Sequence, residues 1–564
     1  MKYVKEFATA ADYTAYVATD YPKPNVSYVV ADGAMHYNPD VPPPPPPFFV
    51  KLTVQDYDND GLVGEPTEVE LQGSGELTQC MILPYLSYVE DQETEEVTGT
   101  CISSIVCGDL CTSIGDLYNA WEGSCIESEE DSFKIDYTCG LLQTLVISNS
   151  VASISGSAFS ECYGIRTLYI GSGVTNINQV FTMEYCGLSD VEVDAANPVY
   201  DSRNNCNAVI ETATNTLIKG SDAAFIPNGI TSISDYAFNG CTGLTSINIP
   251  SGVTSISYGA FGDCYSLTSI TIPDSVTSIG YAAFENCQCL TSINIPSGVT
   301  SIGGNAFTSC FSLTSITIPN GVTSIGENTF LGCSGLTTCT LGSGVTSIIT
   351  NAFLYCSSLS SITVDAANAT YDSRNNCNAI IQTSTNTLIK GCNTTVIPNT
   401  VTSIGNSAFN CCYSLTSITI PDSVTSIGGS AFYGCRSLST ITIPDSVTSI
   451  GERAFYNCTA MTTCYIGSGV TSIGNSAFEF CSSLTSITIP NGVTSIGGGV
   501  FSRCSSLSAI TSLATTAPTI YDYTFYDIKT GGTLTIQSGS SGYNTWMGTG
   551  TYYLGYYNWT KVEQ

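Results

Sequence analysis

The sequence predicts a β-rich repeat solenoid, and three observations lead to this prediction. A marker phenylalanine recurs every 23 residues through two long runs of the chain. Apolar residues follow each marker at fixed offsets. Charged residues make up only 11% of the chain, so serine, threonine, asparagine and glycine fill most other positions. A fixed period of this length is typical of stacked coils that bury their apolar sides against one another. The markers are Phe238, Phe261, Phe284, Phe307, Phe330, Phe353, Phe409, Phe432, Phe455, Phe478 and Phe501.

One repeat, residues 261–283, explains the unit. Its leucine and isoleucines alternate with threonine and serine, which is the period of a half-buried strand, so Ser269 and Thr271 are expected to face outward. Pro273 ends this strand because proline has no N–H for the ladder. A second short extended piece follows, and residues 282–287 have room only for a helical or 3₁₀ turn. We therefore predict 23-residue coils with short parallel strands and one such turn.

The pattern LxxIxIPxxVxxIGxxAFxxC, which begins at Leu267, resembles the leucine-rich repeats of the BspA-like (Treponema pallidum-type) class. The resemblance covers roughly residues 139–536, about 70% of the chain, and more than ten copies agree in position and residue type. It implies a leucine-rich-repeat superhelix. It also implies a relation to binding proteins that are mostly surface-exposed or secreted, in bacteria and some protozoa.

Residues 1–41 are predicted to form a small α/β head that attaches the protein to a larger assembly. A short amphipathic helix is expected at 7–17 and a hairpin at 25–37, with its turn at 31–33. The segments DYTAYV, NVSYV and HYNP are similar to short N-terminal segments that precede varied modules in gut Bacteroidetes and their phages. Six prolines at 42–47 then form a stiff spacer of roughly 19 Å, with an SH3-type ligand as the alternative.

Residues 48–99 are predicted to form a small β module with an acidic run. Asp56, Asp58 and Asp60 stand at alternate positions before a glycine, as in the calcium-binding loop of an EF-hand. The glutamate that this pattern needs at loop position twelve is replaced by Thr67. The aspartates are therefore candidate calcium ligands, and the alternative is an ordinary acidic turn. The sequence requires no other cofactor.

Residues 100–158 hold degenerate repeats, as expected of a terminal cap, and the leucine-rich repeat solenoid runs from 159 to 513. Two longer coils interrupt it, at about 190–230 and 361–400. They contain almost the same text, which reads VDAANPVYDSRNNCNAVIETATNTLIKG in the first copy. A hairpin is predicted inside each copy.

The duplicated text includes a group of polar residues, Asp201, Arg203 and Asn205. Taken alone they suggest a functional site. Because the whole segment occurs twice in the array, the sequence favours a role as turn-forming residues in a longer coil.

Residues 514–564 form an aromatic tail that contains Phe525, Trp546, Trp559 and eight tyrosines. Similar tails close other repeat arrays of this type, so the main interpretation is a C-terminal cap. The alternative is an exposed aromatic surface for sugars or a protein partner, in which both tryptophans contact the ligand.

The sequence offers little that points to catalysis. The only histidine, His36, lies in the head, so the solenoid holds no Ser-His or Cys-His pair and no Cys-His zinc site. No Walker or dinucleotide glycine motif appears, because the glycines follow the 23-residue period. No pair of carboxylates of the kind that hydrolyses glycosides stands out from the repeats. We therefore expect a protein that is not an enzyme.

The charge balance disfavours several classes of partner. The chain has 47 acidic and 15 basic residues, a net charge of −32 at pH 7. Without a basic cluster, neither nucleic acid nor an anionic membrane surface is an expected partner. No stretch approaches 18 apolar residues, so membrane insertion is not expected. The N-terminus lacks the apolar core of a signal peptide. We therefore expect synthesis in the cytoplasm and display on a phage virion, with a bacterial cell surface as the alternative.

Twelve of the 26 cysteines occupy one repeat position, three residues after one of the eleven marker phenylalanines or after Phe159. Stacking at about 4.8 Å keeps in-register Cβ atoms farther apart than the about 3.8 Å of a disulfide. We predict buried free thiols that act as small apolar fillers. Cys101, Cys107, Cys111 and Cys125 lie off this ladder, and their spacing matches no strong zinc pattern.

The outward strand positions carry nearly uniform serine, threonine and asparagine. A surface this repetitive suits a repetitive ligand, so we expect adhesion to a polymeric glycan or to a host or cell-envelope surface. The alternative is a structural spacer or decoration protein without a ligand. The candidate ligand-binding residues are Ser269, Thr271, Ser315, Thr317, Thr442, Tyr465, Trp546 and Trp559.

Overall fold

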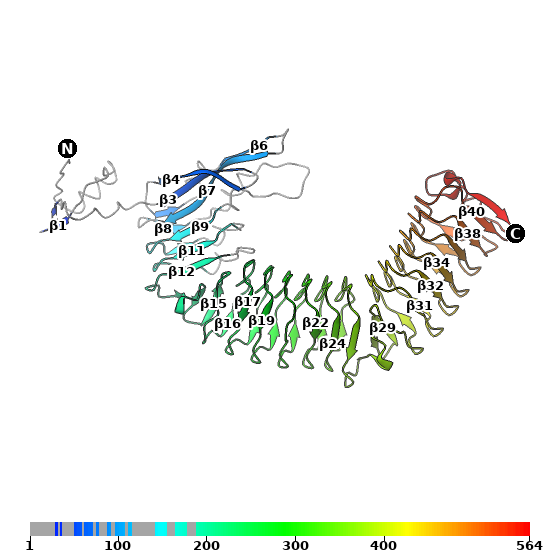
Figure 1. The fold of residues 1–564 in the computed structure, drawn as a ribbon, viewed down its shortest axis with the longest axis horizontal. Helices are drawn as coiled ribbons and strands as arrows, with labels where there is room; N and C mark the ends of the chain where they lie inside the picture. Colours follow the sequence, from blue (N-terminus) through cyan, green and yellow to red (C-terminus); the bar gives the residue numbers. More distant parts are fainter. Residues whose placement is uncertain are drawn as a thin grey trace. The chain divides into compact units, whose positions relative to one another are not determined.

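The computed structural model describes residues 142–154, 164–177 and 188–564, and before residue 142 it describes only the strands named below (Figure 1). The chain divides into two compact units. The first comprises residues 1–180 with 193–198, and the second comprises residues 181–192 with 199–564.

The first unit holds a hairpin, a mixed sheet and a small parallel sheet. Its strands are β1 (Val29–Ala31), β2 (Ala34–His36), β3 (Val50–Asp58), β4 (Gly61–Leu71), β5 (Gly75–Leu77), β6 (Ser87–Asp91), β7 (Glu96–Cys107), β8 (Cys111–Ile114), β9 (Thr144–Ile147), β10 (Ser153–Ile154) and β11 (Thr167–Ile170). The mixed sheet has the order β11-β9-β7-β3-β4 with β6 beside β7, and the parallel sheet has the order β10-β8-β5.

The described strands confirm the predicted head hairpin, since β1 and β2 pair antiparallel with Ala31 opposite Ala34. The predicted helix at 7–17 and the proline spacer lie outside the described residues. Strand β7 pairs antiparallel with β3 and parallel with β9, where Ile105 lies opposite Leu145. The predicted boundary between residues 99 and 100 therefore falls inside β7, because one strand serves both the β module and the first coil.

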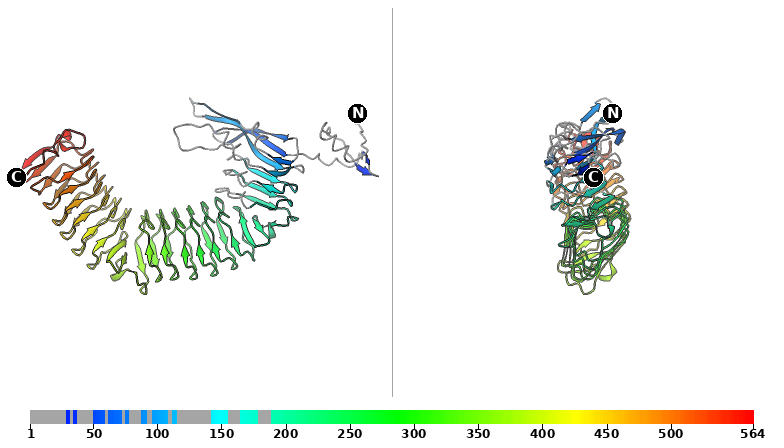
Figure 2. Two further views of the ribbon diagram at one scale, coloured as in Figure 1. Left: turned by 180° about the vertical axis from the view of Figure 1, so that it is seen from behind. Right: turned by 90° about the vertical axis from the view of Figure 1, so that its left-hand side faces the viewer.

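The second unit is a stack of coils, most of which supply one long and one short parallel strand (Figures 1 and 2). Equivalent residues pair one repeat apart, as Ser246 pairs with Ser269 and Ile256 with Ile279. The long strands are β17 (Ser246–Asn248), β19 (Ser269–Thr271), β22 (Ser315–Thr317), β24 (Thr338–Leu341), β26 (Ser361–Val364), β32 (Thr440–Ile443), β34 (Thr463–Ile466), β36 (Ser486–Ile489), β38 (Ala509–Ser512), β40 (Thr533–Ile536) and β41 (Thr560–Glu563).

The short strands mostly consist of a serine and an isoleucine, and the isoleucine points into the core. They are β16 (Ser232–Ile233), β18 (Ser255–Ile256), β20 (Ser278–Ile279), β21 (Ser301–Ile302), β23 (Ser324–Ile325), β25 (Ser347–Ile348), β30 (Ser403–Ile404), β31 (Ser426–Ile427), β33 (Ser449–Ile450), β35 (Ser472–Ile473), β37 (Ser495–Ile496) and β39 (Thr519–Ile520).

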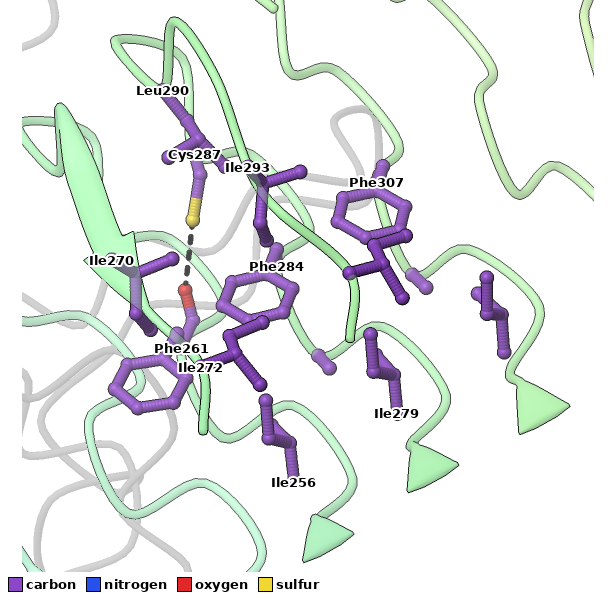
Figure 3. Close-up of a cluster of buried hydrophobic side chains, with 14 of the residues drawn as sticks. Ile256, Phe261, Ile270, Ile272, Ile279, Phe284, Cys287, Leu290, Ile293 and Phe307 are labelled. Atoms are coloured by element: carbon purple, nitrogen blue, oxygen red, sulfur yellow. Dashed lines mark hydrogen bonds between the residues drawn. The ribbon is translucent and has the colours of Figure 1, made fainter. Parts of the chain in front are cut away.

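The core is a set of ladders, and the phenylalanine ladder is the most regular (Figure 3). The rings of Phe261 and Phe284 are parallel within 4°, with centroids 5.5 Å apart. Such aromatic pairs stabilise a fold by about 0.5–1.5 kcal/mol beyond area burial. Beside them, the Sγ of Cys287 donates a hydrogen bond of 3.1 Å to the Phe261 carbonyl, and this contact repeats in other coils. The predicted buried thiols are confirmed for the described ladder cysteines, which are free.

The segment around each marker phenylalanine is a turn and not a helix. Glu285 N–H reaches the Ala282 carbonyl, an i to i−3 bond, but Ala282 and Asn286 adopt positive φ of 52° and 58°. These left-handed residues stop 3₁₀ propagation, and the Phe284 N–H bonds to Ala306 of the next coil instead. The expected helical or 3₁₀ turn is therefore only a single turn. The 3₁₀ helices of the described residues are η2 (Arg203–Asn205), η3 (Arg374–Asn376) and η4 (Leu554–Tyr557).

Both long coils contain the predicted hairpin. In the first long coil, β14 pairs antiparallel with β13 and with β15. Strand β15 also pairs parallel with the short strand β16 of the next coil. Arg203 forms an ion pair of 2.7 Å with Asp201 and also donates to the side-chain amide oxygen of Asn215, so these residues hold the turns together. The strands are β12 (Asp190–Val193), β13 (Tyr200–Asp201), β14 (Val209–Glu211), β15 (Thr216–Lys219), β27 (Tyr371–Asp372), β28 (Ile380–Gln382) and β29 (Thr387–Lys390).

The tail closes the second unit as a cap. Trp546 is fully buried and its indole N–H donates to the Pro518 carbonyl at 3.1 Å. Trp559 is 5% exposed and donates to the Lys529 carbonyl at 2.8 Å. The expectation that these two tryptophans contact a ligand is wrong, because their rings fill the last layer of the core.

The ladder thiols should resist alkylation in the native protein. Burial raises the pKa of Cys310 from 9.0 to about 12, so the reactive thiolate is scarce at pH 8. At pH 8, iodoacetamide should label the exposed Cys289 and spare its buried neighbour Cys287, and denaturation should make both reactive in peptide mass spectra. Equal native labelling of the two residues would contradict the buried ladder.

The raised pKa of Cys310 also predicts how stability depends on pH. Its contribution to the free energy of unfolding should be complete below about pH 9 and should decline as the pH rises toward 12.

Replacement of Trp546 by alanine should destabilise the C-terminal coils by about 3–5 kcal/mol, because a large side chain leaves a cavity in the last core layer. Thermal unfolding and amide exchange in β40 measure this effect. Tyr556→Ala in the same tail is the matched control, since Tyr556 is 52% exposed and should change stability by less than about 0.5 kcal/mol. Unchanged exchange in β40 of the Trp546 variant would argue against the cap.

Candidate functional site

We call the outward side of the long strands the strand face. Ser269, Thr271, Ser315, Thr317 and Thr442 are all exposed on it, as predicted. The alternate residues point inward, and Ile270 and Ile316 are 8% and 2% exposed. The strand face is therefore a set of polar columns on an apolar layer.

The strand-face hydroxyls differ from the neighbouring threonines in their hydrogen bonding. Thr268 and Thr314, just before the strands, donate to the carbonyls of the preceding coil at 3.0 and 3.1 Å. Within the described residues, the hydroxyls of Thr271, Thr317 and Thr442 form no hydrogen bond with the protein. These hydroxyls remain available as donors and acceptors for a ligand.

A hollow of about 610 Å³ brings two predicted residues together on the strand face. Thr442 of β32 lies in register with Tyr465 of β34, and both line the hollow. Tyr465 is 62% exposed. Ser269, Thr271, Ser315 and Thr317 belong to other long strands and do not line it.

A second hollow of about 700 Å³ shares its lining at 417–420 and Asp422 with the first. Its most exposed apolar residue is Val396, at 73%. The repeat pattern did not predict this exposed residue, although the sequence contains a signal for it. Ordinary coils have threonine or asparagine at the second position before the proline of this strand, whereas the long coils have Phe225 and Val396.

One carboxylate at the first hollow is held in its charged form. Asp445 accepts hydrogen bonds from the backbone N–H and the hydroxyl of Ser468, at 2.7 and 3.0 Å. These bonds lower the pKa of Asp445, with the backbone contact as the larger cause. The hollow therefore combines an aromatic ring, free hydroxyls and a fixed acceptor, a combination that suits a polyhydroxylated ligand.

The acidic run in the first unit does not form the loop that an EF-hand requires. Asp56 and Asp58 belong to β3 and lie opposite Val63 and Gly61 of β4, so the run sits at the end of a tight hairpin. The side chains of Asp56 and Asp58, and the whole of Asp60, lie outside the described residues. In the part of the chain whose side chains are described, no group of three potential metal ligands occurs.

Comparison with protein families gives one clear match. The model for the "BspA type Leucine rich repeat region (6 copies)" matches residues 124–207, 221–287, 254–381 and 402–532. No curated protein matches the chain. Among the described helices, none has the length and apolar character needed to cross a membrane.

Several solved structures resemble this one. A leucine-rich repeat protein from Bacteroides ovatus has 22% identity and a TM-score of 0.41, over 85% of this chain and 98% of that one. A leucine-rich cell surface protein from Faecalibacterium prausnitzii has 32% identity and a TM-score of 0.44, over 56% of this chain and 95% of that one. A leucine-rich repeat protein from Eubacterium ventriosum has 25% identity and a TM-score of 0.43, over 59% and 85% of the two chains.

Proposed function

The chain belongs to the BspA-type leucine-rich repeat family, whose members are generally surface or binding proteins, and from this premise we propose that it is a non-enzymatic adhesion protein for a polymeric glycan or a host or cell-envelope surface. The observation that carries the proposal is the strand face, where polar side chains repeat in register from coil to coil and the exposed hydroxyls of Thr271, Thr317 and Thr442 have no protein partner.

The strand face favours a polymer over a single sugar. Each hydrogen bond to an exposed hydroxyl contributes only about 0.5–1.5 kcal/mol. Equivalent hydroxyls recur at the strand spacing of about 4.8 Å. Useful affinity therefore requires contacts with many coils at once, which a chain of repeated sugar units supplies.

We propose a phage virion as the surface of display, on the strength of the resemblance carried by the head. A bacterial cell surface is the second candidate, because family members are generally surface-exposed. In both cases residues 1–41 would attach the protein, and the solenoid would present the strand face. Calcium binding by Asp56, Asp58 and Asp60 is a separate proposal, which rests on the spacing of these aspartates in the sequence and does not require an EF-hand loop.

Bulky groups on the strand face should block adhesion. The triple variant Thr271→Trp, Thr317→Trp, Thr442→Trp should weaken adsorption to cells and to polysaccharides on a glycan array at least tenfold, because the indoles hold the polymer away from the columns. The matched control is Thr277→Trp, Thr323→Trp, Thr448→Trp. These threonines are also exposed and lie six residues later in the same coils, beside the short strands. Equal adsorption by both triple variants would contradict the strand face as the contact surface, and no adsorption by the parent protein would favour a spacer without a ligand.

Deletion of residues 1–41 should release the solenoid from its assembly without unfolding it. The truncated protein should keep its melting temperature and should no longer co-purify with virions or cell envelopes. Deletion of the cap residues 543–564 is the comparison, since it should lower stability but leave attachment intact. A head-deleted protein that still co-purifies would show that another region attaches it.

A further inference from the structure

A second surface of the C-terminal coils differs from the strand face in composition. We call it the turn edge and define it by the residues one or two positions after the marker phenylalanines and Phe525. There Tyr433 stacks on Tyr456 with ring centroids 4.9 Å apart, and Tyr456 meets the ring of Phe480 at 5.3 Å, edge to face. The guanidinium of Arg503 lies 4.7 Å from the Phe480 centroid. Aromatic and arginine side chains thus form a continuous band over four coils.

The coil itself does not require these side chains. At the same positions, most other coils have small or polar residues, such as Asn239 and Gly240, and the larger exceptions are Leu331, Leu354 and Tyr355. Phe480 and Arg503 have positive φ of 62° and 57°, a region that bulky residues seldom adopt. Glycine occupies the position of Phe480 in the coil of Gly434, at φ 69°. Positive φ recurs at this position in other coils, as at Asn286, Ser309 and Tyr355, so the backbone conformation belongs to the repeat, and it is the size of the Phe480 side chain that the coil does not require.

The band borders a hollow of about 590 Å³, which is within the usual size range of small-ligand sites. None of its lining residues belongs to the two hollows of the strand face. Tyr523, which is 50% exposed, packs against Tyr552 with centroids 4.2 Å apart. The lining is Tyr456, Ser476, Glu479, Phe480, Gly498, Gly499, Ser502, Arg503, Asp522, Tyr523 and Tyr526.

The charges in the hollow indicate the class of ligand. Glu479, Asp522 and Arg503 all line it, and the Ser502 hydroxyl contacts Glu479 at 3.3 Å. A strongly anionic ligand would meet two carboxylates, and a cation would meet the guanidinium that already covers Phe480. A neutral polyol avoids both conflicts, because it donates to the carboxylates, accepts from the guanidinium and lays its C–H face on an aromatic ring.

We propose that the turn-edge hollow binds a neutral pyranose unit of a glycan, which lies beside Phe480 on the exposed ring of Tyr523 and is hydrogen-bonded to Glu479, Asp522 and Arg503. The proposal rests on the proposed function in taking a glycan as the ligand, but it places a discrete sugar site away from the strand face. Because the hollow is local, it predicts binding of short oligosaccharides that is lost when Phe480 is replaced, whereas binding at the strand face does not depend on Phe480.

The test titrates the full chain with neutral hexasaccharides of α-glucan, β-glucan, mannan and galactan by isothermal calorimetry, with polygalacturonate fragments as the anionic comparison. At least one neutral probe should bind. Phe480→Gly should weaken this binding at least tenfold, since it removes the ring and places glycine at a positive φ, so the fold is kept. Glu479→Gln and Asp522→Asn should each weaken binding several-fold, and Tyr456→Phe should preserve it.

Tyr258→Ala is the matched control, because Tyr258 is an exposed tyrosine stacked on Tyr281 at 5.2 Å in coils that lack this hollow. It should leave affinity unchanged. The proposal is overturned if no neutral hexasaccharide binds at millimolar concentration, if Phe480→Gly binds like the parent, or if the anionic fragments bind more tightly than every neutral probe. A protein partner whose binding is lost in Phe480→Gly, without any oligosaccharide binding, would likewise overturn it in favour of a protein interface.

The outcomes separate this site from the strand face. If cells and polysaccharides bind but the loss follows only the strand-face triple variant, the turn-edge site is overturned and the proposed function stands. If hexasaccharide binding is lost in Phe480→Gly while the strand-face variant still adsorbs to cells, the turn-edge site stands and the strand face is not the contact surface.

Discussion

The stacking of one phenylalanine on the next is the interaction on which the second unit depends. Phe307 and Phe330 lie with their rings parallel and their centroids 5.5 Å apart, which requires every coil to repeat the same backbone path. The Sγ of Cys333 also donates a hydrogen bond to the Phe307 carbonyl at 3.0 Å. The thiol, the ring and the backbone of each coil therefore repeat at the same distance along the stack. The regular 23-residue period keeps these three sets of contacts aligned from one coil to the next.

The two long coils interrupt the 23-residue period. Each adds a hairpin and ends on a glycine, Gly220 or Gly391, against the ring of the next marker phenylalanine. A Cβ at either glycine would overlap that ring. The buried Lys219 donates to the Asn239 carbonyl at 3.1 Å, which satisfies a charge in a layer that is otherwise apolar.

Because the inward side chains of each coil pack in the core ladders, only the outward side chains can contact a ligand. Some outward hydroxyls also serve the stack, as Thr268 does when it donates to the Thr245 carbonyl. Thr271 has no such contact, and Tyr465 and Phe480 are larger than the coil requires. Both the strand face and the turn edge therefore contain side chains that are not needed to stack the coils.

The sequence by itself determined the coil, its parallel strands, the buried thiols, the two hairpins and the aromatic cap, because each follows from a local period or from a duplicated text. It also placed Thr442 and Tyr465 on the outward columns. Only the tertiary structure decided which residues meet across coils. It put Trp546 and Trp559 inside the cap, joined β7 to both the β module and the first coil, and turned the acidic run of Asp56 and Asp58 into the end of a hairpin. It also placed Phe480, Arg503 and Asp522 around one hollow, although they are 23 and 19 residues apart in sequence. These outcomes depend on distances between coils and on what fills the space at their ends, and no periodicity within one coil contains that information.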